Sequence, residues 1–171
     1  GGLAGTVNIV TNSTDDAANS DITHGDISTE GGSVTGTGNG GSGGGVSINT
    51  FGGQSSISGT NITTDGGDAQ TGSGGNASGA IIATNETSTT ADSDITYTGT
   101  ISIQGGDSTV SGNGGGGSLA TIRTDGGLSD INLVNVITSG GNATAGNGGG
   151  GGNIDIDTNE TTATVTVTGG L

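Results

Sequence analysis

One short pattern recurs five times along the chain, and this periodicity restricts the fold more than any other feature of the sequence. Each copy has apolar residues at alternate positions and ends in threonine. The terminal threonines are 39, 34, 40 and 34 residues apart, so pairs of copies define a longer repeat of 73–74 residues. Such a recurring unit predicts a fold built by stacking like on like. The copies end at Thr11, Thr50, Thr84, Thr124 and Thr158.

Each copy continues with the same parts in the same order. In the first copy, residues 20–23 and 26–29 are short segments centred on isoleucine. A Gly-Gly pair with a small polar residue follows at 31–33, and a glycine-rich stretch at 36–45 closes the unit. The order predicts three short strands and one tight glycine-rich surface crossing per unit. No segment has the 3.6-residue period of a helix.

No single unit carries enough apolar surface to fold alone, so the units are expected to stack. We predict an all-β parallel β-helix (β-solenoid) of about five stacked units of 34–40 residues, forming a single domain over residues 1–171. A β-sandwich or β-barrel would not require the same order of segments in every unit, because each of its strands has a different environment. An alternative is that each unit forms two shorter coils, but the 14-residue spacing from Thr50 to Thr64 leaves little room for a complete coil. The predicted core ladder is Ile9, Ile48, Ile82, Ile122 and Ile156.

The composition excludes several classes of function. The chain has 42 glycines, a net charge of −15, one arginine and no lysine, so it lacks the basic patch that nucleic-acid binding needs. It has no cysteine and no apolar run long enough to span a membrane. Because it begins at Gly1, we expect a processed form or a window of a longer fibre protein.

Glycine runs lead into an apolar strand pattern at residues 40–48, 74–82, 114–119 and 148–156, with Ile-x-Ile at the end of the last run. These runs resemble those of glycine-rich parallel β-helix proteins of microbial cell surfaces. These proteins are similar in architecture to pectin-lyase-like and filamentous-haemagglutinin-like repeats. The resemblance covers nearly the whole chain and implies an extracellular location and a structural or adhesive role.

Catalysis is not expected, and we assign no catalytic or cofactor-binding residue. Asp155, Asp157 and Arg123 are the nearest approach to the carboxylates and base of a polysaccharide lyase. There is no second basic residue to move a proton and almost no aromatic surface for a sugar. His24 is interpreted as an ordinary exposed residue, because other copies hold glycine or tyrosine at its position.

One aspartate position recurs in three units and is the candidate metal site. Asp21, Asp94 and Asp130 would stack about 4.8 Å per coil, and like charges at that spacing repel. A structural Ca²⁺ held by carboxylate and carbonyl oxygens would relieve the repulsion. Ser56 interrupts the column, so screened carboxylates on a solvated face are the alternative.

Three Asn-x-Ser/Thr motifs recur in register beside a turn, at Asn12, Asn85 and Asn159. In a surface protein these asparagines are candidate acceptors of glycans. Ordinary turn asparagines are the alternative, since the chain is rich in asparagine, serine and threonine.

Both ends of the chain carry strand patterns without the polar cap that an isolated solenoid needs. We therefore expect copies to join head to tail through Val7, Ile9, Val165 and Val167, giving a filament, sheath or surface layer. The alternatives are the stalk of a cell-surface adhesin and a carbohydrate-active β-helix. The expected partners are copies of the chain itself, with divalent cations or glycans as further ligands.

Overall fold

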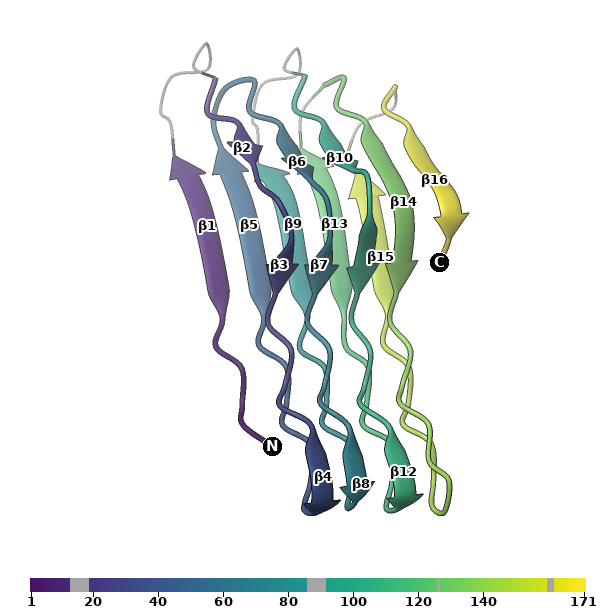
Figure 1. The fold of residues 1–171 in the computed structure, drawn as a ribbon. Helices are drawn as coiled ribbons and strands as arrows, with labels where there is room; N and C mark the ends of the chain where they lie inside the picture. The colour runs from purple at the N-terminus through teal and green to yellow at the C-terminus, as the bar shows by residue number, and fades with distance from the viewer. Residues whose placement is uncertain (13–18, 86–91, 126, 160–161) are drawn as a thin grey trace.

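A computed structural model of the chain describes residues 1–12, 19–85, 92–125, 127–159 and 162–171. Over these residues the regular structure is entirely β, and the paired strands run parallel. The chain makes about four turns of a β-solenoid, and β15 and β16 begin a further turn (Figure 1). The predicted parallel β-helix is thus confirmed. No helix among these residues is long and apolar enough to cross a membrane.

The recurring apolar pattern forms the first sheet, with one strand from each turn. Alternate side chains point inward, and the register pairs Ile9 with Ile48 and Ile48 with Ile82, as the repeat predicts. The predicted isoleucine ladder therefore exists, and Ile48, Ile82 and Ile122 are 0% exposed. The strands are β1 (Val7–Asn12), β5 (Val46–Phe51), β9 (Ala80–Asn85), β13 (Ala120–Asp125) and β15 (Ile154–Thr158).

In three of the repeats the terminal threonine closes the turn between the first two sheets through a hydrogen bond within the described residues. The Thr50 hydroxyl is buried and donates to the main-chain oxygen of Ser55 at 2.9 Å, and Thr124 donates to Ser129 at 3.2 Å. Most buried hydroxyls have such an acceptor, and a carbonyl in a turn offers one. The buried hydroxyl of Thr84 is the exception, because it has no partner among the described residues. This bond explains why a polar residue ends an otherwise apolar inward face.

The two short predicted segments of each unit form the second sheet, which faces the first across the core (Figure 1). In the fourth turn a single strand, β14, spans both segments. Ile57 pairs with Ile95 and Ile62 with Ile101, in the order that the repeat predicts. The strands are β2 (Ile22–Thr23), β3 (Ile27–Ser28), β6 (Ile57–Gly59), β7 (Ile62–Thr63), β10 (Ile95–Tyr97), β11 (Thr100–Ser102), β14 (Ile131–Ile137) and β16 (Val165–Gly170).

A third, narrow sheet lies at the far tip of the turns, and the sequence analysis did not predict it. Its order is β12-β8-β4, and its register shifts within each pair. These strands contain few large apolar residues, so their pattern resembles the adjoining glycine-rich crossing. They are β4 (Val34–Thr37), β8 (Ala69–Thr71) and β12 (Ser108–Ser111).

Between the main sheets and the tip, each turn runs out and back as two glycine-rich arms that touch through their backbones (Figure 1). Gly41 N donates to Gly32 O, Gly67 N to Gly41 O, and Gly75 N to Gly67 O, at 2.8–2.9 Å. The outgoing arm leaves the main sheets for the tip, and the returning arm comes back from it. The bonds link the outgoing and returning arms within one turn and between successive turns. We call this two-layered region the glycine blade. Its interior is main chain packed on main chain, which requires residues without a side chain.

Candidate functional site

Each end of the solenoid leaves the main-chain edge of a strand unpaired. Among the described residues β1 pairs only with β5, and β15 only with β13. Val7 and Ile9, two of the predicted assembly residues, are only half-buried on β1. Their partners in the next turn, Val46 and Ile48, are 2% and 0% exposed. The core ladder therefore continues to the N-terminal end face and is uncovered there.

The opposite end face has the same character. Val165 and Val167 on β16 pair with Ile131 and Leu133 of β14. Val165 is 45% exposed and Val167 half-buried, while Ile131 and Leu133 are 0% and 3% exposed. Ile156 on β15 is half-buried beside them. The four predicted assembly residues thus lie on edge strands, two at each end face.

The aspartate column predicted as a metal site is a hydrogen-bonded ladder along the outside of the turn. The carboxylate of each aspartate accepts the main-chain N–H of the equivalent residue one turn on. Asp21 accepts from Ser56 at 2.8 Å, Asp94 from Asp130 at 2.7 Å, and Asp130 from Thr164 at 2.7 Å. Ser56 has the same role, because its hydroxyl oxygen accepts the main-chain N–H of Asp94 at 3.2 Å.

These bonds give each carboxylate a structural partner other than a metal ion. Burial is the main cause that raises the pKa of Asp94 above the ordinary 3.8, with the N–H of Asp130 opposing it. In the part of the chain that the structure describes, no three histidine or acidic residues gather closely enough to hold a metal ion. Calcium at Asp21, Asp94 and Asp130 stays a prediction.

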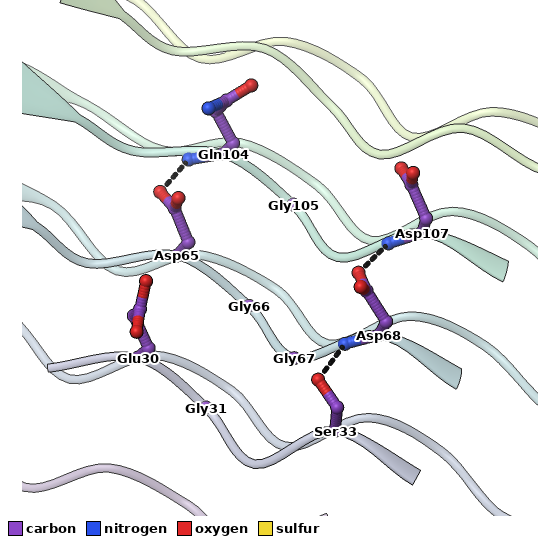
Figure 2. Close-up of a pocket in the computed structure, with 10 residues that line it drawn as sticks. All are labelled: Glu30, Gly31, Ser33, Asp65, Gly66, Gly67, Asp68, Gln104, Gly105 and Asp107. Carbon is purple, nitrogen blue, oxygen red and sulfur yellow. Dashed lines mark hydrogen bonds between the residues drawn. The ribbon is translucent and has the colours of Figure 1, made fainter. Parts of the chain in front are cut away.

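A second acidic region, a groove along the outgoing arms of the blade, was missed by the sequence analysis (Figure 2). Asp65 accepts the N–H of Gln104 at 2.7 Å, and Asp68 accepts that of Asp107 at 2.8 Å. Burial raises the pKa of Asp65, and the nearby charge of Glu30 adds to the shift. The signal was available, because Asp68 and Asp107 occupy the small polar position after two of the four Gly-Gly pairs.

The side chains of two predicted glycan acceptors take part in hydrogen bonds. Asn85 Nδ2 donates to Thr50 O at 3.3 Å, and Asn159 Nδ2 donates to the carboxylate of Asp125. Asn12 is exposed at the end of β1. The hydroxyl residues that complete the three motifs lie outside the described residues. Glycosylation at these positions stays a prediction.

The residues weighed for catalysis lie in two separate places. Arg123 pairs in register with Asp157, and both are exposed on the outer face of the first sheet. His24 directly follows β2 of the second sheet, where it is half-buried and hydrogen-bonded to Tyr97. The interpretation of His24 as an ordinary exposed residue is therefore wrong, because its register position faces the core.

Comparisons with protein-family models, with curated proteins and with solved structures found no match for this chain.

Proposed function

We propose that this chain is a structural segment of an extracellular filament, sheath or surface layer, in which further coils of the same kind cover both end faces. Copies of the chain, joined head to tail, supply those coils. β15 of one copy pairs with β1 of the next, so that Ile156 meets Ile9 as Ile122 meets Ile156 within the chain.

The observation that supports this proposal is the half-buried apolar ladder on unpaired edge strands at both ends. An exposed strand edge is a template for pairing with another chain. Here the edge also carries Val7 and Ile9 at one end and Ile154 and Ile156 at the other, all incompletely buried. Stacking would bury them as fully as Ile48 and satisfy the main-chain groups of both edges.

The two faces differ, so their contact is heterologous. Because they lie at opposite ends of the stack of coils, the contact repeats along the stacking direction, which favours an open filament over a ring. The net charge of −15 opposes lateral clustering and also opposes stacking at low salt. We therefore expect assembly to strengthen as ionic strength rises from 0.01 M to 0.15 M, because the Debye length falls from about 30 Å to about 8 Å.

Analytical ultracentrifugation and electron microscopy of the purified chain test the proposal. The expected result is a sedimentation coefficient that grows with protein concentration, together with thin unbranched rods. Val10→Pro should reduce this growth, because Val10 is exposed on β1 and its main-chain N–H points to the open edge. The N–H of Val7 points toward the adjoining turn, because it donates to Gly45 O. Main-chain N–H groups alternate in direction along a strand, so the N–H of Val10, three residues on, points away from that turn.

Val10→Thr is the matched control, because it keeps the main-chain donor and a β-branched side chain. This control variant should assemble like the parent chain. A parent chain that stays monomeric at millimolar concentration and 0.15 M salt would overturn head-to-tail assembly. It would favour the stalk of an adhesin, in which the coils belong to one polypeptide.

A further inference from the structure

The same tetrapeptide, Gly-Asn-Gly-Gly, occurs three times on the returning arms of the blade. Its asparagines are Asn39, Asn113 and Asn147. An asparagine before glycine is prone to deamidate, because the glycine nitrogen can attack the side-chain amide carbon without steric hindrance. Since the local sequence is identical at the three sites, any difference in their reactivity must come from the tertiary structure.

At the first two sites, both groups that would react are held by the next turn. Asn39 Oδ1 accepts the N–H of Ser73 at 2.9 Å, and Gly40 N donates to Ser73 O at 2.9 Å. Asn113 Oδ1 accepts the N–H of Asn147 at 2.9 Å, and Gly114 N donates to Asn147 O at 2.9 Å. Ring closure at either site requires both hydrogen bonds to open together.

The third site has the same sequence without these restraints. Among the described residues, Asn147 Oδ1 accepts no main-chain N–H, and Gly148 N donates to no carbonyl. The side chains of Asn39, Asn113 and Asn147 are all exposed, so access to water does not distinguish them. What distinguishes Asn147 is that, among the residues that the structure describes, no main-chain group of an adjacent turn holds its amide and the Gly148 nitrogen apart.

We propose that Asn147 is a site of spontaneous deamidation, and that the adjoining turn protects Asn39 and Asn113. Gly148 N bonds to the Cγ of Asn147 as the Cγ–Nδ2 bond breaks, and ammonia leaves with the proton lost by Gly148 N. Water then opens the succinimide ring to aspartate or isoaspartate. No other reactant is needed.

The product changes the C-terminal end of the blade. Aspartate adds one negative charge, and isoaspartate also lengthens the main chain by one methylene group. The next residue, Gly149, donates to Gly141 O at 2.8 Å in a closely packed part of the blade. An isoaspartate at 147 would shift this bond, so aged chains should lose order first at this end.

Peptide mass spectrometry of the folded chain, incubated at pH 7.4 and 37 °C, tests the inference directly. Conversion at Asn147 should be at least about tenfold faster than at Asn39 or Asn113, since each protected site must open two hydrogen bonds. The experiment is run at a protein concentration at which sedimentation velocity detects monomer alone. It therefore tests Asn147 independently of any assembly.

The same chain in concentrated urea is the reference, and there the three sites should convert at equal rates. Asn147→Gln should abolish most ammonia release from the folded chain, because a six-membered imide forms far more slowly. Equal conversion of the three sites in the folded chain, or slower conversion at Asn147, would overturn the inference.

Discussion

His24 Nε2 and the Tyr97 hydroxyl lie 2.7 Å apart, across the turn of the solenoid that separates them. Gly59 occupies the same register position on the intervening turn, and both rings lie over it. His24 Nδ1 is 2.6 Å from Gly25 O, which can only accept, so in the neutral imidazole Nδ1 carries the proton and Tyr97 donates to Nε2. Burial raises the pKa of Tyr97, so its hydroxyl remains a donor.

Substitution of Gly59 should destabilise the protein more than loss of the hydrogen bond itself. A methyl group at Gly59 would overlap the rings of both His24 and Tyr97, at 2.5 and 2.7 Å. We expect Gly59→Ala to cost about 1–3 kcal/mol and Tyr97→Phe about 1 kcal/mol in the free energy of unfolding by urea. Ser58→Ala on the outer face should change it by less than about 0.5 kcal/mol. Equal losses for Gly59→Ala and Ser58→Ala would contradict the stacked arrangement.

Neighbouring isoleucines on β9 offer a matched test of the core ladder. Ile82 is 0% exposed and Ile81 is 45% exposed, although they are adjacent in sequence. Ile82→Ala should lower the free energy of unfolding by about 2–5 kcal/mol, because a cavity forms between two turns. Ile81→Ala should cost less than about 1 kcal/mol. Chemical denaturation of both variants measures the difference, and similar costs would mean that the strand faces are wrongly assigned.

The glycine blade predicts opposite outcomes for two adjacent glycines. A Cβ on Gly149 would overlap the carbonyl of Gly115, whereas one on Gly150 meets nothing within 4 Å. We expect Gly149→Ala to lower the melting temperature, at a cost of about 1–3 kcal/mol. Gly150→Ala should be neutral or stabilise by about 0.4–1 kcal/mol through the unfolded chain. The expectation that the whole run is a tight crossing thus holds only at certain positions. Calorimetry of the two variants measures their melting temperatures and so tests the predicted difference.

Two aspartates should give opposite dependences of stability on pH. Burial raises the pKa of Asp65, so the folded state holds its proton more tightly, and stability falls as pH rises above the ordinary 3.8 through the folded value. Hydrogen bonds, first that from Thr60, lower the pKa of Asp26, so its stabilisation is present above 3.8 and is lost as pH falls through the folded value.

Asp65→Asn should therefore raise the urea midpoint at pH 7 and lose this advantage at pH 3. Asp26→Asn should lower the midpoint at pH 7 and approach the parent chain at pH 3. The carboxamide can still accept an N–H in either variant, so the comparison isolates the charge. The same direction of change for both variants at pH 7 would refute the assignment.

The repeat predicted the strands of the two main sheets and their register correctly. Alternation assigns Ile48 and Ile82 to one face, and equal spacing requires them to stack. The third sheet was not predicted, because strands such as β8 (Ala69–Thr71) are held by pairing with neighbouring turns and have little apolar pattern. The end-face residues, such as Val7, were placed by the same periodicity. The acidic groove was missed, since it is formed by three turns together.

The sequence by itself determined the period, the inward ladder and the parallel stacking, because these depend on residue spacing that every turn repeats. Only the tertiary structure decided which glycines are tightly packed, that His24 reaches Tyr97, and that Asn147 lacks the restraints of Asn113. These properties depend on what the adjacent turn places opposite each residue. Identical segments such as the Gly-Asn-Gly-Gly copies therefore acquire different environments, because the described residues place main-chain partners opposite Asn39 and Asn113 and none opposite Asn147.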